Sequence, residues 1–399
     1  MELKFNKHKH FNQAYSVTGK RVRRIALNAE EELFLEGNFF YRVKDRGLTE
    51  RFYSEKQDEQ LKDIFRDNTV PAFIETVEGV YAGIHVDKKN RKITVFSDKL
   101  KRQEVYYYTD ADEVIVATSL SNLQPKAGAY SQECIISIMY LYAPKGSTIY
   151  SNIYRLRYNE IIEITGGNPR IIKCREKALE ILDYGEEHLA KFEGILENAI
   201  ISRASDELNV VQLSGGWDST FLIAMLLKHF GNDSIKAVTM EVVLGDGRVF
   251  NPYEVEKSRK IAEYYNVDFE TITVNYNDEA LIDLWKHQIK EKVMAQGIYH
   301  AMLFHHFMMA KYIREKYGEN VVVFNGEGCD SLNNFGFSQY ISIKHDSHDF
   351  CEYADKMGCY LYSPSFFKKI LDNTHTDDFI FKMYTWYFNN FKYIKSECL

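Results

Sequence analysis

The chain has few cysteines and no long apolar run. Its 399 residues include six cysteines, and no two of them form a C-x-x-C pair. This spacing argues against a structural zinc site and against a disulfide framework. No apolar run approaches the roughly 20 residues of a membrane helix, and the first residues have no signal-peptide core. We therefore expect reduced thiols, a cytoplasmic location and no membrane partner.

The chain also has no excess of basic residues. Lys and Arg together number 50 against 57 for Asp and Glu, so the formal net charge is −7. This balance argues against a nucleic-acid partner. The length and a hydrophobic content of 45% are sufficient for two domains with separate cores. We expect one domain over 1–180 and another over 181–399.

The most informative stretch is a glycine loop between two apolar runs. The short run Asn209 to Leu213 has the length of a strand, and the longer run from Phe221 to Phe230 has that of a helix. Between them stands Ser214-Gly215-Gly216-Trp217-Asp218-Ser219-Thr220. The glycines let backbone N–H groups converge on an anion, and the helix start adds its positive dipole end. Three hydroxyls and a carboxylate complete a set that suits a nucleotide whose phosphates share Mg²⁺ with Asp218.

This loop is not a Walker loop, because it contains no lysine and no Gly-Lys-Ser/Thr ending. It resembles instead the pyrophosphate loop of the ATP pyrophosphatases. The resemblance implies ATP and Mg²⁺ as cofactors, cleavage between the α and β phosphates, and a substrate carried forward as its adenylate. The alternative is an ordinary glycine turn between a strand and a helix.

The first half of the chain predicts an antiparallel, sheet-rich layer domain. A helix is expected over Asp58 to Arg66. The expected strands are Glu32 to Arg42, Ala72 to Val77, Val80 to Val86, Lys92 to Ser97, Val105 to Thr109 and Glu113 to Thr118. Asp87-Lys88-Lys89-Asn90 is expected to form a hairpin turn.

Several short stretches of this half resemble the N-terminal glutaminase domain of the asparagine synthetase family. They are Val77 to Gly83, Ser97-Asp98 with the basic turn that follows, Tyr106 to Tyr108, and Ala117 to Leu123. Leu141 to Tyr150 and Ile153 to Ile164 resemble the bridge into that family's synthetase domain. The resemblance implies an α/β fold class: an N-terminal αββα sandwich of the N-terminal-nucleophile type, then a parallel-sheet ATP pyrophosphatase domain of the adenine nucleotide α-hydrolase type.

The second residue departs from this family pattern. In glutamine-using members that residue is a cysteine whose thiol attacks the glutamine amide. Here it is Glu2, and no cysteine precedes Cys134. We therefore expect a degenerate domain without glutaminase activity. The β-lactam synthetases and lasso-peptide cyclases share this loss and take the amine from the substrate itself.

After the glycine loop, strand and helix patterns alternate, which predicts a parallel sheet with covered faces. Strands are expected over Ile235 to Val242 and Phe269 to Val274, with a charged helix over Glu254 to Tyr265. A ligand should lie across the carboxyl ends of such strands. The resemblance implies that adenine lies against backbone near Leu213 and Met240.

A second loop follows the buried run from Val321 to Asn325. It reads Gly326-Glu327-Gly328-Cys329-Asp330-Ser331-Leu332 and resembles the family's Ser-Gly-Glu-Gly-x-Asp-Glu-Leu. The resemblance implies that Gly326 lies at the nucleotide, that Asp330 joins Asp218 as a metal ligand, and that Glu327 is the base for the incoming amine. Taken alone, the run is an ordinary strand-to-helix turn, with Cys329 a small buried residue.

The family also places a substrate pocket and a catalytic lysine late in the chain. We expect Gln296, Tyr299 and His300 near the pocket. The histidines at 300, 305 and 306 lack the spacing of a zinc helix. Among Lys368, Lys369, Lys392 and Lys395, we favour Lys395 as the lysine that neutralises phosphate charge.

The sequence thus predicts an ATP-dependent, AMP-forming carbon–nitrogen ligase of biosynthesis. Its partners would be a small-molecule or peptide carboxylate and an amine from a source other than glutamine, and a homodimer is compatible with the sequence. Three alternatives stay open: a glutamine- or ammonia-dependent amidotransferase, a sulfur or nitrogen transferase, and a non-catalytic ATP-binding protein.

Overall fold

The structure is a computed structural model that describes residues 1–43, 49–52, 56–66, 68–131, 134, 146–174, 185–294 and 303–326. The chain divides into two compact units, the first taking in most residues up to Asn198 and the second most residues from Ala199 onward. The domain boundary predicted near residue 180 lies outside the described residues. Among the helices of the described part, none is both long and apolar enough to cross a membrane.

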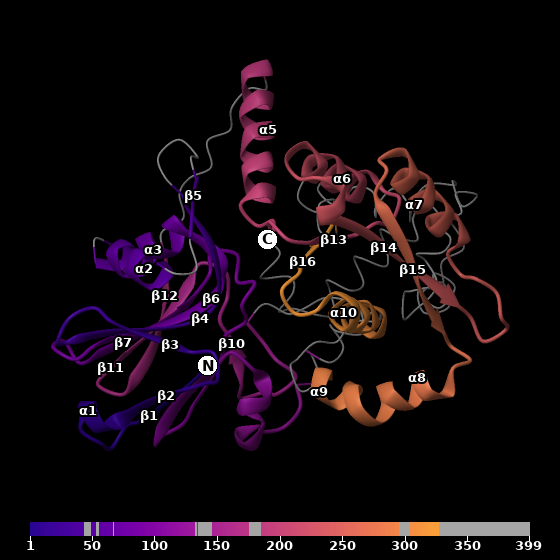
Figure 1. Cartoon of the computed structure of the whole chain (residues 1–399). Coiled ribbons are helices and arrows are strands. Elements are labelled where there is room, and N and C mark those ends of the chain that lie inside the picture. The colour runs from indigo at the N-terminus through magenta and orange to yellow at the C-terminus, as the bar shows by residue number, and fades with distance from the viewer. Residues whose placement is uncertain are drawn as a thin grey trace, which may run out of the picture. The chain divides into compact units, whose positions relative to one another are not determined.

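The first unit is built from short helices and antiparallel strands (Figure 1). Its strands are β1 (Glu2–Asn6), β2 (Tyr15–Thr18), β3 (Arg23–Ala26), β4 (Glu31–Val43), β5 (Thr49–Arg51), β6 (Val77–Asp87), β7 (Lys92–Ser97), β8 (Tyr106–Thr109), β9 (Glu113–Ala117), β10 (Tyr154–Arg155), β11 (Glu160–Thr165) and β12 (Asn168–Lys173). Its helices are α1 (Phe11–Ala14), α2 (Gln57–Arg66), α3 (Val70–Thr76) and the 3₁₀ turns η2 (Leu120–Asn122) and η3 (Gln124–Lys126). The helix α5 (Glu186–Ile201) follows them.

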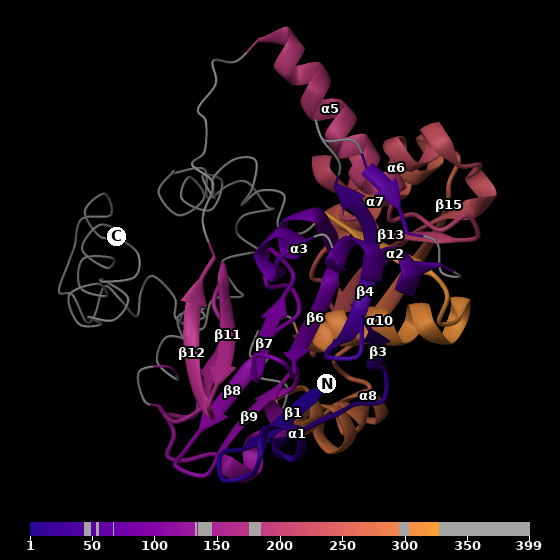
Figure 2. The same ribbon diagram turned by 90° about the vertical axis from the view of Figure 1, so that its left-hand side faces the viewer.

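These strands form two sheets that pack face to face. One sheet has the order β10-β8-β9-β1-β2, and the other has β12-β11-β7-β6-β4-β3 with β5 beside β4 (Figure 2). Alternate residues of both sheets point into one core, where Leu3 and Val116 of the first sheet join Ile84, Val95 and Ile162 of the second. The predicted sheet-rich layer domain is confirmed.

Helices cover the outer face of the larger sheet. There α2 and α3 pack Leu61, Phe65 and Phe73 against Tyr81 and Phe96 of the sheet. On the outer face of the smaller sheet, the 3₁₀ turns pack Leu120 and Leu123 against Tyr106 and Ile115. Within the described residues the unit therefore has a helix layer, two sheets and a thinner layer of turns.

The strand predicted over Ala72 to Val77 is wrong, because those residues belong largely to α3. Thr69 caps this helix by accepting a hydrogen bond from the Ala72 amide, and a proline stands in its first turn. Val70, Phe73 and Ile74 are buried on one face at helical spacing. The short apolar run thus follows the helical period, which a strand-length window obscured.

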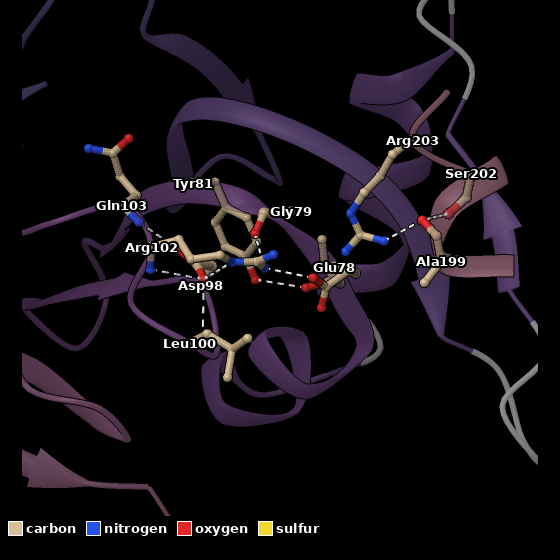
Figure 3. Close-up of polar contacts among 11 residues, drawn as sticks. Glu78, Gly79, Tyr81, Asp98, Leu100, Arg102, Gln103, Ala199, Ser202 and Arg203 are labelled. Carbon is tan, nitrogen blue, oxygen red and sulfur yellow. Dashed lines mark hydrogen bonds and ion pairs between the residues drawn. The ribbon is translucent and has the colours of Figure 1, made fainter. Parts of the chain in front are cut away.

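The basic turn after β7 closes around a buried acid, Asp98, which is 0% exposed (Figure 3). Its carboxylate accepts hydrogen bonds from the amides of Leu100, Arg102 and Gln103 at 2.9–3.3 Å and from Arg102 Nε at 3.1 Å. Arg102 Nη2 also donates to Glu78 Oε1 at 2.6 Å and to the Gly79 carbonyl at 2.5 Å. These partners of Asp98 lie in its own turn, and Arg102 connects the turn to β6. Asp98 therefore stabilises the fold of this unit.

The second unit is built around a parallel sheet. Its strands are β13 (Asn209–Gln212), β14 (Ile235–Val243), β15 (Asp268–Asn275) and β16 (Val322–Asn325). Its helices are α6 (Trp217–His229), η4 (Asn232–Ser234), α7 (Pro252–Tyr264), α8 (Glu279–Leu284), the π-helix η5 (Trp285–Ile289), α9 (Lys290–Met294) and α10 (Leu303–Tyr317). The predicted parallel sheet is confirmed.

Helices cover both faces of the parallel sheet. On one face α10 packs Met309 and Ile313 against Val210, Val238 and Ile272. The helices α6 and α7 lie on the other face (Figure 1). They follow β13 and β14 in the chain, as crossover connections of a doubly wound sheet do.

Candidate nucleotide site

The site lies where the strand order of the parallel sheet reverses. The order β15-β14-β13-β16 means that the chain runs outward from β13 to β15 and then returns to add β16 on the opposite side of β13. Loops at such a reversal diverge and leave a crevice at the carboxyl ends of the two strands. Gln212 and Asn325, the last residues of β13 and β16, pair in register, and Asn325 Nδ2 donates to Gln212 Oε1 at 2.9 Å. Both predicted loops therefore leave the sheet at this edge.

The backbone of the first loop is shaped for an anion. Gly215 has φ +72°, a left-handed conformation that a residue with a side chain rarely adopts. Gly216 is the N-cap of α6, and no side chain caps this helix start. The first-turn N–H groups of a helix have no acceptor inside the helix, so a ligand phosphate can provide one.

The hydroxyls of the loop have different roles. Ser219 is only 2% exposed, accepts from the Ser214 amide at 3.2 Å and donates to the Gly216 carbonyl at 3.3 Å. Thr220 Oγ1 donates to the same carbonyl at 2.8 Å. These two side chains hold the loop in shape, whereas the Ser214 side chain is exposed to a ligand.

Two hydroxyls outside the loop hold Leu213, the residue directly before it. The carbonyl of Leu213 accepts hydrogen bonds from Thr239 Oγ1 and, at 2.9 Å, from Ser258 Oγ. Thr239 and Ser258 are both buried, on β14 and α7. Sequence reasoning missed both residues, because a buried hydroxyl within a strand or helix pattern gives no signal of its partner. Met240, the other residue predicted near adenine, lies on β14, and its carbonyl accepts from Asn251 Nδ2 at 2.7 Å.

The second loop begins directly against Asp218. A Cβ placed on Gly326 would lie 3.0 Å from Asp218 Cβ and 3.0 Å from the Ser219 amide nitrogen. A side chain at this position would make an unusually tight contact, so a glycine suits position 326. The Asp218 carboxylate, together with the phosphate oxygens of a bound nucleotide, would suit Mg²⁺. This ion keeps several waters and takes one or two protein carboxylates. Asp218 is the described residue that would hold such an ion.

A protein-family model matches the part of the chain that contains this loop. Residues 191–371 match the asparagine synthase family model, a range that includes β13, the loop, α6 and β16. The match covers 181 of the 399 residues, and this part of the chain is similar to an asparagine synthase domain. No curated protein matches the sequence.

Among solved structures, the chain is similar to three proteins at low identity. Glutamine phosphoribosylpyrophosphate amidotransferase from B. subtilis, complexed with ADP and GMP, is 11% identical, with a TM-score of 0.25 over 62% of this chain and 47% of that chain. The allosteric regulatory enzyme of purine biosynthesis is 10% identical, with a TM-score of 0.27 over 81% and 74%. Glutamine-dependent NAD⁺ synthetase from Acinetobacter baumannii, in complex with ADP, is 15% identical, with a TM-score of 0.24 over 49% and 41%. The chain thus spans less than half the length of the first and third.

Several predicted residues of the synthase domain lie outside the described part of the chain. They are Gln296, Tyr299, His300, Glu327, Gly328, Cys329, Asp330, Lys368, Lys369, Lys392 and Lys395. The structure brings together Leu213, Ser214, Gly215, Gly216, Asp218, Ser219, Thr220 and Gly326. Of the two predicted metal ligands, Asp218 and Asp330, the structure describes only Asp218.

In the first unit, β1 carries Glu2 where the family resemblance implies a nucleophilic cysteine. Glu2 pairs in register with Thr18 and Ala117, and its carboxylate lies 3.1 Å from Lys4 Nζ. The two described cysteines lie elsewhere. Burial raises the pKa of Cys134 to about 11 and also raises the pKa of Cys174, which keeps both as thiols near neutral pH. Neither cysteine has the character of an activated nucleophile.

His305, one of the three histidines without zinc-helix spacing, lies on α10. Its Nε2 is 2.8 Å from the Tyr276 hydroxyl, and its ring contacts Phe304. Burial, and then the neighbouring His306, lower the pKa of His305. These contacts give His305 a packing role in the second unit.

Proposed function

We propose that this protein is an ATP-dependent, AMP-forming ligase that adenylates a substrate carboxylate for attack by an amine. The observation that carries the proposal is the Ser214–Thr220 loop at the reversal point of the parallel sheet, with Gly326 packed on Asp218. A carboxylate lacks a good leaving group, and adenylation provides one. The carboxylate oxygen attacks the α phosphorus, the α–β bridge breaks, and pyrophosphate leaves from the loop.

The loop would act on the leaving group. Backbone N–H groups at Gly215, Gly216 and the start of α6 would stabilise charge that develops on pyrophosphate. A bound Mg²⁺, held by Asp218 and phosphate oxygens, would add charge neutralisation there. The first unit would be a scaffold, since Glu2 replaces the nucleophile that glutamine hydrolysis requires. The amine would come from the substrate itself or from free ammonia, in the biosynthesis of a specialised metabolite or peptide.

The test is ATP–pyrophosphate exchange against a panel of amino acids, peptides and small acids, with products resolved as AMP or ADP. We expect Mg²⁺-dependent exchange with at least one acid, and AMP as the nucleotide product. Asp218→Asn should lower the exchange rate by about a hundredfold or more, since it replaces the carboxylate that would hold Mg²⁺ at the phosphates by a neutral amide.

Binding is measured separately from turnover through Trp217, which is 91% exposed within the loop. ATP should change its fluorescence, and Trp217→Phe should remove that change. ATP binding without exchange, for any acid in the panel, would instead indicate a non-catalytic nucleotide-binding protein. Release of ammonia from glutamine would indicate the amidotransferase alternative.

A further inference from the structure

The phosphate loop contains no positively charged side chain. The segment Ser214–Thr220 offers backbone N–H groups, hydroxyls and a carboxylate. A pyrophosphate group carries several negative charges, and charge-assisted hydrogen bonds from a lysine or arginine are the strong contacts to it. The question is whether another element brings a cation to this loop.

Helix α7 brings one to Gly215. A Cβ placed on Gly215 would lie 3.1 Å from each of Cβ, Cγ and Cδ of Lys257. The methylene groups of Lys257 thus pack against the loop at Gly215, where a side chain on that residue would otherwise lie. The ammonium group is two bonds beyond Cδ, so it stays close to the loop.

The position of this stem is fixed by the residues beside it. Val255, Ser258 and Ala262 form the buried face of α7, and Ser258 Oγ donates to the Leu213 carbonyl at 2.9 Å. That hydrogen bond ties the helix to the residue directly before the loop. Lys257 precedes Ser258 and is itself exposed, so its stem follows the loop while its charge stays in solvent.

The charge of Lys257 is also available. Its basic neighbours on α7 share Glu256, which lies 3.2 Å from Lys260 Nζ and 4.0 Å from Arg259 Nε. Among the residues that the structure describes, no acidic group forms an ion pair with Lys257. A lysine held at a phosphate loop without an internal partner is suited to an external anion.

We propose that Lys257 contacts the pyrophosphate part of ATP and supplies from α7 the positive charge that the loop lacks. This inference rests on the proposed function and adds a specificity-determining residue to its site. Lys257 should strengthen binding of ATP and pyrophosphate, and should have no effect on ligands that lack the β and γ phosphates.

The experiment measures calorimetric binding of inorganic pyrophosphate, ATP and adenosine, with Mg²⁺, to the full chain. The variants are Lys257→Met, Lys257→Arg and the matched control Lys260→Met, which removes the same charge from an exposed position of the same helix. We expect Lys257→Met to weaken pyrophosphate and ATP binding about tenfold. Adenosine binding should not change, Lys257→Arg should retain most of the affinity, and Lys260→Met should resemble the wild type.

Two results would overturn the inference while leaving the proposed function standing. One is equal pyrophosphate affinity in Lys257→Met and Lys260→Met. The other is a parallel loss of adenosine and pyrophosphate binding in Lys257→Met, which would indicate a purely structural role. A wild-type chain that binds neither ATP nor pyrophosphate would overturn both proposals.

Discussion

The turn after β7 and the loop after β13 each place a carboxylate shortly beyond the end of a strand, but they treat it differently. Asp98 is fully buried and accepts three backbone N–H groups and an arginine from its own surroundings. Asp218 stands in the first turn of α6, beside an uncapped helix start and an exposed Ser214. The first turn closes around its acid, whereas the second loop leaves donors for a ligand. An acid near a strand end is therefore structural where its own turn closes around it, as at Asp98.

The largest expected difference between the Asp98 turn and the Ser214–Thr220 loop is in the free energy of unfolding. Asp98→Asn removes a buried charge that Arg102 and three amides surround, so we expect a loss of about 3 kcal/mol. Hydrogen exchange of peptides spanning β6 and β7 should accelerate, while ATP binding to the second unit should persist. Accelerated exchange confined to the Ser214–Thr220 peptide would contradict this assignment.

Nucleotide binding should produce the opposite pattern. At a ligand concentration about a hundred times the Kd, binding stabilises the unit that holds the site by about 2.7 kcal/mol. Exchange should slow in peptides over β13, α6 and α7 on addition of Mg²⁺ and ATP. Peptides around Asp98 should be unaffected, and protection there would show that the two regions are not functionally distinct.

A smaller effect is expected where the second loop meets the first. Gly326→Ala places a Cβ 3.0 Å from Asp218 Cβ and from the Ser219 amide nitrogen, so the first loop must shift by a few tenths of an ångström to accept it. We expect ATP affinity to fall about tenfold, or about 1.4 kcal/mol. Gly231→Ala is the matched control, because a Cβ there meets nothing within 4 Å. Equal affinities of the two variants would rule out close packing at Gly326 as a requirement.

The smallest expected effect is a pH dependence of the first unit. Burial lowers the pKa of His85, against the opposing effects of Glu31 and Asp87 and with a minor contribution from Lys92. The folded state therefore prefers the neutral imidazole. Above pH 6.5 the histidine is neutral in both states and does not change the free energy of unfolding. As the pH falls from 6.5 toward the lower pKa of the folded state, the unfolded state binds the proton first, and the free energy of unfolding declines.

His85→Phe should flatten that decline and preserve the contact with Phe65, whose ring centroid lies 4.9 Å from that of His85. Urea unfolding between about pH 5 and pH 7, monitored by hydrogen exchange of β6 peptides, measures how steeply the free energy of unfolding changes with pH. A slope that does not change in the variant would assign the pH dependence to another group.

Much of the fold could be predicted from local pattern. The strands β4, β6, β7 and β8 and the alternation after Asn209 follow from their periodicity, because half-buried strands and amphipathic helices repeat with different periods. The segment Val70–Thr76 is the exception, because its short apolar run fits a strand window. Its cap at Thr69 and the proline in its first turn identify the helix only once their contacts are known.

The sequence by itself predicted an anion site at the loop, because two glycines, an acid and a helix start stand there at the spacing that such sites use. It did not determine which distant residues surround that site. Thr239, Ser258, Lys257 and Gly326 reach the loop only because the parallel sheet reverses at β13 and sets β14, α7 and β16 around it. Such contacts depend on strand order, and strand order is a property of the whole packed sheet.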